Sequence, residues 1–295
     1  MSYFSDEMRI GCAESDAKRD EGLILPEDII RFEDIAYGTD AMQKLDVYRP
    51  KNIEGKLPVI VSVHGGGWVY GDKELYKHYC VHLAQRGFVV VNFTYRLSPE
   101  YKFPCHLEDT VLVFYWMLEH TEVYGMDKEN IFAVGDSAGG NILALFCCLC
   151  TNDTYAKNFP FQAPKTFIPK AVALNCAVLD MDLAKKGTSG TTMQLMKDVF
   201  TNEGTEEELH LINPIAHVNE KFPPCYIMTS SDDFLKEHPK TFCEKLEDVG
   251  VPYEFMLYAD ETQPLYHVFH LDMRNEVGIQ CNEKECAYFY QMIKR

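Results

Sequence analysis

Short apolar runs alternate along this chain with longer segments in which apolar and polar residues mix at helical spacing. Residues 59–63 and 88–91 are almost continuously apolar, which is typical of central strands covered on both faces. Strands that alternate with helices predict the α/β class, in which helices flank a mostly parallel sheet. The predicted strands are residues 30–36, 43–48, 57–64, 88–95, 130–135, 171–176, 225–229 and 253–258. The predicted helices are residues 73–86, 107–121, 138–149, 239–249 and 282–293.

One interval interrupts this alternation. Almost fifty residues separate the strand that ends at 176 from the strand that begins at 225, which is too long for an ordinary connection. The interval contains two short predicted helices, residues 193–200 and 206–211. We expect an insertion at about residues 178–218 to fold over the carboxyl edge of the sheet. With about residues 1–28 it would form a small helical cap on a single domain that spans residues 1–295.

The apolar run at residues 130–134 leads directly into Gly-Asp-Ser-Ala-Gly at residues 135–139. A strand that ends in Gly-x-Ser-x-Gly and continues into a helix is typical of a nucleophile elbow. A Cβ at either flanking position would clash in so tight a turn, and glycine also tolerates strained dihedral angles. Ser137 would then expose its hydroxyl at the carboxyl edge of the sheet. Because a hydroxyl is a weak nucleophile at neutral pH, it needs a base, an orienting acid and an oxyanion hole.

Three consecutive glycines follow the predicted strand 57–64. They expose backbone N–H groups with no side chains in the way. Such donors, with the N–H of the residue after the nucleophile, can surround a developing oxyanion. The predicted oxyanion donors are Gly66, Gly67 and Ala138.

The base and the acid are sought after Ser137, because the α/β-hydrolase order is serine, then acid, then histidine. His267 follows the last predicted strand and is the favoured base, while His270 lies three residues on and competes with it. Asp232 and Asp233 follow the strand 225–229, and we favour Asp233 as the acid. The other aspartate would then accept hydrogen bonds from local backbone N–H groups, a common role in turns. The further histidines after the elbow are His210, His217 and His238.

Composition narrows the range of partners. The hydrophobic fraction of 46% is ample for a sizeable core, and the formal net charge is −17. We expect no nucleic-acid partner, because phosphate binding requires a basic surface. Carboxylates are spread along the chain, which favours a solvated acidic surface.

Eleven cysteines, an odd number without regular spacing, indicate a reducing compartment rather than a disulfide framework. Cys147 and Cys150 form a CxxC pattern, which we assign to core packing rather than to a metal because no second pair has zinc spacing. Residues 1–20 lack a signal-peptide stretch, and no segment reaches the roughly 20 apolar residues of a membrane span. These features predict a cytoplasmic protein with no membrane span.

Four motifs, taken together, resemble the hormone-sensitive-lipase family of α/β-hydrolase esterases. They are His-Gly-Gly-Gly-Trp at 64–68, Tyr-Arg-Leu-Ser-Pro-Glu at 95–100, Gly-Asp-Ser-Ala-Gly-Gly-Asn at 135–141, and Asp-Phe-Leu at 233–235 with His-Val-Phe at 267–269. The resemblance implies that Ser137 is the nucleophile, His267 the general base and acid, and Asp233 its orienting carboxylate. It also implies that residues 95–100 are a scaffold beside the oxyanion loop. Residues 104–106 and the N-terminal segment depart from the family pattern, so substrate preference is not carried over.

The resulting hypothesis is a serine carboxylesterase, a carboxylic ester hydrolase that cleaves short-chain acyl esters through an acyl-enzyme. Its expected partner is a small-molecule ester, it requires neither a metal nor an organic cofactor, and it is a monomer or a homodimer. One alternative is a serine peptidase on the same fold, although the chain offers no β-propeller domain. Another is a non-catalytic small-molecule-binding protein, although relatives of that kind have lost the histidine that His267 supplies here.

Overall fold

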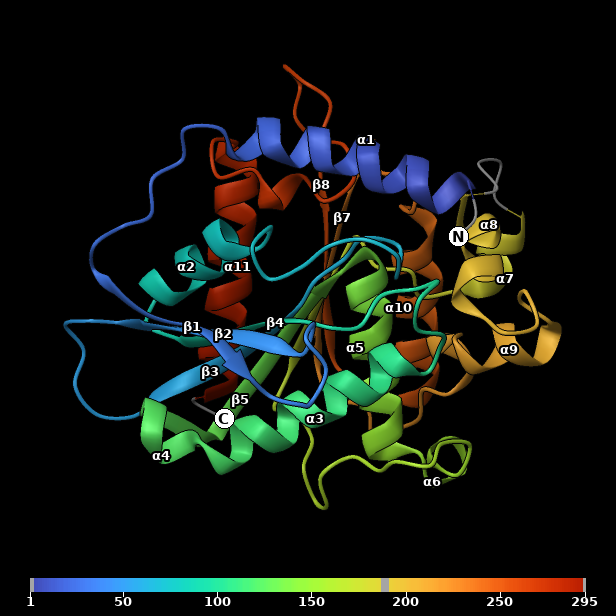
Figure 1. Ribbon diagram of the computed structural model, residues 1–295, viewed down its shortest axis with the longest axis horizontal. Helices are drawn as coiled ribbons and strands as arrows, with labels where there is room; N and C mark the ends of the chain where they lie inside the picture. The colour runs from blue at the N-terminus through green and yellow to red at the C-terminus, as the bar shows by residue number, and fades with distance from the viewer. Residues whose placement is uncertain (1–2, 187–190, 294–295) are drawn as a thin grey trace.

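A mostly parallel sheet runs through the molecule, with helices on both of its faces (Figure 1). The computed structural model describes residues 3–186 and 191–293. Within these residues the strand order is β1-β2-β4-β3-β5-β6-β7-β8; only the β1/β2 and β2/β4 pairs are antiparallel. The strands are β1 (Ile29–Ala36), β2 (Lys44–Pro50), β3 (Leu57–Val63), β4 (Val89–Thr94), β5 (Met126–Asp136), β6 (Val172–Asn175), β7 (Cys225–Ser230) and β8 (Tyr253–Tyr258). The predicted α/β class is confirmed.

The central strand β3 shows why its apolar run is continuous. Successive side chains of a strand point to opposite faces of the sheet. Val59 and Val61 pack in one core with residues of α3, α5 and α10, whereas Ile60 packs in a second core with residues of α2 and α11. Helices therefore cover both faces, as Figure 1 shows. The helices are α1 (Tyr3–Asp20), α2 (Lys77–Gln85), α3 (Cys105–Glu119), α4 (Thr121–Tyr124), α5 (Ser137–Thr151), α6 (Asp153–Ala156), α7 (Met181–Lys186), α8 (Thr191–Val199), α9 (Glu206–Leu211), α10 (Glu237–Val249) and α11 (Glu276–Ile293), with 3-10 turns η1 (Pro214–Ala216) and η2 (Phe269–Leu271).

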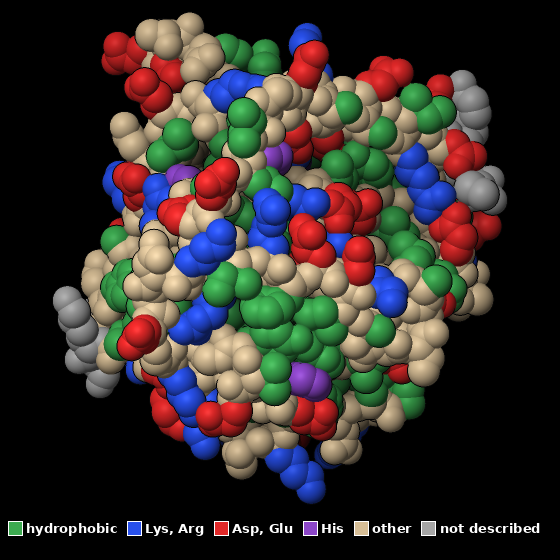
Figure 2. Space-filling view, turned by 60° about the vertical axis from the view of Figure 1, so that its left-hand side comes forward, with side chains coloured by type: hydrophobic (Ala, Val, Ile, Leu, Met, Phe, Trp, Pro, Cys, Tyr) green, Lys and Arg blue, Asp and Glu red, His purple; other side chains and the backbone are tan. Residues whose placement is uncertain are grey.

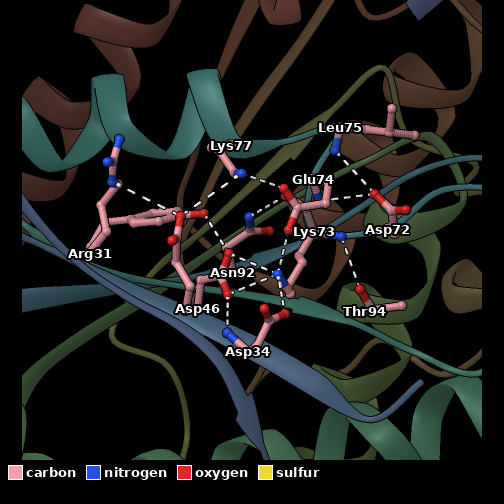
Figure 3. A network of polar contacts seen from close by, with 12 residues as sticks. Arg31, Asp34, Asp46, Asp72, Lys73, Glu74, Leu75, Lys77, Asn92 and Thr94 are labelled. Atoms are coloured by element: carbon pink, nitrogen blue, oxygen red, sulfur yellow. Dashed lines mark hydrogen bonds and ion pairs between the residues drawn. The ribbon is translucent and has the colours of Figure 1, made fainter. Parts of the chain in front are cut away.

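The helix predicted from residue 73 begins only at Lys77, because an ion-pair network around the buried Lys73 fixes the residues before it (Figure 3). Lys73 is 5% exposed at its side chain, and its Nζ lies 3.0 Å from carboxylate oxygens of both Asp46 and Asp34. Its backbone carbonyl also accepts a hydrogen bond from Asn92. These contacts join the segment that follows the glycine-rich loop to β2 and β4.

Several other helices differ from the sequence prediction, among them the long helices α11 and α1. The last helix, α11, begins at Glu276 rather than at residue 282. Residues 3–20 form the helix α1, which the sequence patterning did not indicate. In contrast, α9 has the predicted bounds, because Thr205 and Glu208 form a capping box at its start.

The two segments expected to form a cap lie against each other. Helix α1 packs against α8, and Ser5 donates a hydrogen bond to Asp198. Figure 1 shows α1 along one side of the molecule, with its first turn beside α8. Residues 1–2 and 187–190 of the expected cap, and residues 294–295 of the expected domain, lie outside the described residues.

Acidic and basic side chains are interspersed over the face shown in Figure 2. Although the formal net charge is −17, the acidic side chains therefore do not form one continuous acidic patch on this face. Across residues 3–186 and 191–293, every helix is too short or too polar to cross a membrane.

Candidate active site

Ser137 is the first residue of α5 and directly follows Asp136, the last residue of β5. The turn is tight because a Cβ on Gly139 would lie 2.2 Å from the carbonyl oxygen of Val63. A Cβ on Gly135 would lie 2.7 Å from the carbonyl oxygen of Gly139. The positive φ of 50° falls on Ser137 itself and on neither glycine. The glycines are therefore required for space, and the strained dihedral angle expected of them belongs instead to the serine.

A chain of two hydrogen bonds joins Ser137, His267 and Asp233. His267, in the loop between β8 and η2, has its Nε2 2.9 Å from Ser137 Oγ. Its Nδ1 lies 2.9 Å from Oδ1 of Asp233, which follows β7. An ionised carboxylate can only accept, so Nδ1 carries the proton and Nε2 presents its lone pair to the serine hydroxyl. The fold thus brings His267 next to Asp233, which is 34 positions away in the sequence, and next to Ser137, which is 130 positions away.

The surroundings of Asp233 keep its carboxylate ionised although the residue is buried. Burial opposes the charge, but hydrogen bonds from His267, from the Cys176 thiol and from the backbone N–H of Leu235 hold the pKa of Asp233 below its usual value. Thr229 Oγ1 also donates to Oδ2 at 3.1 Å. Several hydrogen bonds to a carboxylate stabilise its charged form and so lower its pKa.

The two competing residues occupy other places. His270 is fully buried edge-on against Tyr79, and its two ring nitrogens lack a hydrogen-bond partner among the described residues. Burial lowers the pKa of His270 to about 3. Asp232 Oδ2 accepts a hydrogen bond of 3.0 Å from the backbone N–H of Leu265. This contact differs from the local turn role expected of that aspartate, because Leu265 lies 33 residues further along the chain.

The remaining histidines after the elbow make contacts of their own. His217 Nε2 lies 2.8 Å from the carbonyl oxygen of His210, and the two rings meet edge to face. His238 Nδ1 accepts hydrogen bonds from the backbone N–H groups of Leu179 and Asp180.

Glycine is required in the loop after β3 by backbone conformation and by space. Gly66 has φ 108° and Gly67 has φ 60°, and a Cβ on Gly66 would lie 2.1 Å from the carbonyl oxygen of Tyr70. Gly66, Gly67 and Ala138 line the same pocket as Ser137. The fold thus places the predicted oxyanion donors in one pocket with the predicted nucleophile. Their catalytic role belongs to the proposal below.

The segment at residues 95–100 supports this loop. The Tyr95 hydroxyl donates to the carbonyl oxygen of His64 at 3.0 Å, and the two rings stack at 3.9 Å. The backbone N–H of Ser98 donates to the carbonyl oxygen of Trp68.

The sequence profile of the alpha/beta hydrolase fold family matches residues 60–271, which include the glycine-rich loop, the elbow and both of the later loops. The chain belongs to this family. Its predicted membership among the hormone-sensitive-lipase-like esterases and lipases is thereby confirmed.

Curated relatives are similar to this hydrolase over most of its length. It is 29% identical to the carboxylesterase NlhH of Mycobacterium tuberculosis, over 78% of this chain and 73% of that protein. It is 26% identical to the esterase LipC of the same organism, over 73% of this chain and 55% of LipC. A relative from Acanthamoeba polyphaga mimivirus is covered over 60% of its length. The hydrolase therefore spans less than two thirds of these last two proteins.

Among solved structures, Esterase B of Lactobacillus rhamnosis has a similar fold. The TM-score is 0.88 at 22% sequence identity, with 99% of this hydrolase and 97% of that chain covered. A hyperthermophilic esterase of Pyrobaculum calidifontis gives a TM-score of 0.79 at 24% identity, with 99% and 92% covered.

The pocket of the hydrolase has a volume of about 770 Å³ and lies over Ser137 and His267. Its wall includes Trp68 and Leu195. Met196 and Phe200, which are near Leu195 in the sequence, are buried in the core. The sequence did not indicate the wall residues that α1 contributes, which are Phe4, Glu7, Met8, Cys12, Ser15, Asp16 and Arg19.

Helix α1 is fastened to the segments around the glycine-rich loop. Arg9 donates from Nε to the carbonyl oxygen of Val69 at 2.7 Å and from Nη2 to that of Ser98 at 2.8 Å. Its guanidinium also pairs with Glu100 at 2.7 Å. Arg9 thus connects α1 to the residue that follows the 64–68 motif and to the segment at residues 95–100.

Proposed function

We propose that this hydrolase is a serine carboxylesterase in which Ser137 is the nucleophile. The observation that carries the proposal is the hydrogen-bonded chain from Ser137 through His267 to Asp233 at the wall of a pocket. A hydroxyl, an imidazole and a carboxylate in this order are the parts required for acyl transfer.

In the first half-reaction, Ser137 Oγ attacks the ester carbonyl carbon while His267 Nε2 takes the hydroxyl proton. The tetrahedral oxyanion receives hydrogen bonds from the N–H groups of Gly66, Gly67 and Ala138. Loss of one such donor typically costs about 3 kcal/mol of transition-state stabilisation. His267 then gives its proton to the leaving alcohol.

In the second half-reaction, water attacks the acyl-enzyme while His267 accepts a proton from it, and the acid is released when that proton returns to Ser137. Asp233 acts through His267 in both halves. Its carboxylate keeps the proton on Nδ1 and stabilises the imidazolium.

Relatives support the reaction class. NlhH, at 29% identity, is a carboxylesterase, and LipC is an esterase. One Esterase B structure was solved with the enzyme inhibited by a C6-C4 compound.

We propose short acyl chains for the substrate, because a cap of α1 and the insertion reaches the catalytic centre. A Cβ on Gly67 would lie 2.8 Å from Leu195 Cδ1 and 2.9 Å from Met8 Cε. Apolar side chains from both segments therefore touch the oxyanion loop and limit the room beside the nucleophile. The pocket volume of about 770 Å³ is in the range that holds small molecules.

The test is the hydrolysis of p-nitrophenyl esters from acetate to palmitate by the wild type, Ser137→Ala and a matched Ser231→Ala control. We expect Ser137→Ala to lose roughly 10³-fold or more in kcat, whereas the control retains its rate. We also expect kcat/KM to fall from butyrate to palmitate. Near-wild-type hydrolysis by Ser137→Ala would refute the nucleophile assignment, and a preference for palmitate would refute the short-chain proposal.

A further inference from the structure

A thiol that acyl transfer does not use lies directly behind the catalytic histidine. Cys176 follows the end of β6 and is fully buried. Its sulfur lies close to the carboxylate of Asp233 and to the backbone N–H of Val268. Donor atoms of Cys176, Asp233 and His267 all lie within 4.8 Å of one another.

Sulfur, nitrogen and oxygen donors in one cluster form a typical ligand set for zinc. Zinc binds thiolate sulfur at about 2.3 Å and imidazole nitrogen or carboxylate oxygen at about 2.0–2.2 Å. The donor atoms of a tetrahedral site are then about 3.3–3.8 Å apart, so the cluster needs only a small adjustment to accept an ion. A thiolate donor also selects zinc-like ions over magnesium and calcium, which prefer oxygen.

The charges of the cluster also suit a dication. One thiolate and one carboxylate together neutralise two positive charges, which matters in a buried site where an unbalanced charge is costly. Asp233 without the thiol would leave a bound dication with one uncompensated charge. Cys176 is therefore the residue that makes the cluster suitable for zinc.

We propose that Cys176, Asp233 and His267 form an inhibitory binding site for a zinc-like divalent cation on the side of the imidazole that faces away from Ser137. The inhibition rests on the proposed esterase function, whereas the binding does not. The ion would reach the site past His267, which lines the pocket and whose side chain is 20% exposed.

Binding would disable the base through its tautomer. The thiol of Cys176 loses its proton to water as sulfur bonds to the metal. Nδ1 of His267 also bonds to the metal, so the proton that it carried moves through solvent to Nε2. An Nε2–H group then faces Ser137 Oγ and offers no lone pair to accept the hydroxyl proton. The site releases one proton for each ion bound and stops the first half-reaction without contact with the serine.

The first test measures ester hydrolysis at buffered Zn²⁺ concentrations, with each variant compared with its own zinc-free rate. We expect the wild type to be inhibited and a chelator to restore its activity. Cys176→Ser should require at least about tenfold more zinc, because it loses the thiolate ligand. Cys12→Ser is the matched control, because Cys12 is a thiol in the pocket wall outside the cluster, and it should keep wild-type zinc sensitivity. Equal zinc sensitivity of the wild type and Cys176→Ser would overturn the proposal.

The second test detects the metal–sulfur bond itself and does not depend on turnover. Titration of the wild type with Co²⁺ should produce a thiolate-to-cobalt charge-transfer band in the near ultraviolet. The band should persist in Ser137→Ala and be absent from Cys176→Ser. Absence of the band from the wild type overturns the proposal, even where Cys176→Ser fails to fold. A band in a wild type that hydrolyses no ester would leave the metal site standing and refute the esterase proposal.

Discussion

The hydroxyl of Tyr76 donates a hydrogen bond of 2.7 Å to Oδ2 of Asp136, the residue before the proposed nucleophile. The same hydroxyl accepts a hydrogen bond of 2.7 Å from the backbone N–H of Gly65. One buried phenol therefore joins the nucleophile elbow to the first glycine of the oxyanion loop. The relative position of Ser137 and that loop depends in part on this single group.

Tyr76→Phe is expected to destabilise the fold and to slow catalysis. The substitution leaves a buried carboxylate oxygen and a buried N–H group without their shared partner, which typically costs about 1–3 kcal/mol. Urea unfolding measures the loss, and p-nitrophenyl butyrate hydrolysis measures the effect on kcat. Tyr115→Phe is the control, because the Tyr115 side chain is 39% exposed. Equal stability and equal kcat in Tyr76→Phe and the wild type would contradict this account of the junction.

Asp136→Asn is expected to change how stability depends on pH. Burial raises the pKa of Asp136 from 3.8 to about 7, although the hydrogen bond from Tyr76 opposes the rise. A raised carboxyl pKa means that folding favours the protonated form, so the wild type loses this contribution as pH rises from about 4 to about 8. Asparagine does not ionise. The free energy of unfolding of the variant should therefore rise relative to the wild type over that range, by up to roughly 4 kcal/mol.

Denaturant unfolding at a series of pH values checks this expectation. A difference between Asp136→Asn and the wild type that stays constant with pH, or that shifts in favour of the wild type as pH rises, would show that Asp136 ionises normally in the folded state.

Gly139→Ala and Gly11→Ala are expected to have opposite effects on stability. The new Cβ at 139 would lie 2.2 Å from the carbonyl oxygen of Val63, whereas at position 11 it would meet nothing within 4 Å. Gly139→Ala should lose about 3 kcal/mol or fail to fold, because β3 must move to make room. Gly11→Ala should gain about 0.5–1 kcal/mol, since Gly11 lies inside the helix α1. Thermal unfolding compares the two, and tolerance of alanine at 139 would contradict the steric account of the elbow.

Arg9→Ala is expected to reduce activity more than stability. Arg9 donates hydrogen bonds to the carbonyl oxygens of Val69 and Ser98 and to the carboxylate of Glu100. Loss of these contacts should displace α1 and the oxyanion loop. Even a small displacement of groups that position the substrate can lower kcat/KM roughly 10-fold or more. Arg31→Ala, which removes a guanidinium of β1 that pairs with Glu33 at 4.0 Å, is the control. Equal kcat/KM values in the two variants would show that α1 does not brace the loop.

The sequence predicted the sheet well because each strand carries its own signal. The apolar run of β3 and the Gly-x-Ser-x-Gly turn are local patterns. The order of serine, aspartate and histidine along the chain then restricted the choice to a few residues, and the family resemblance selected His267 and Asp233 from them.

Other features depend on contacts that no local pattern records. Helix α1 has a largely polar sequence, and Met8 reaches the oxyanion loop only because the fold sets α1 beside it. Lys73 resembles an ordinary first-turn lysine until the fold surrounds it with Asp34 and Asp46. Cys176 resembles a small core residue, and only the sheet order β6-β7-β8 brings it to Asp233.

The most direct test of the central claim is the covalent mapping of the nucleophile. The wild type is treated with a short-chain alkyl phosphonate that carries a p-nitrophenyl leaving group, and the modified peptide is identified by mass spectrometry. We predict one adduct per chain, on Ser137, formed in step with the loss of ester hydrolysis and absent from Ser137→Ala. Complete loss of hydrolysis with the adduct on another residue, or hydrolysis that continues after Ser137 is fully modified, would contradict the account.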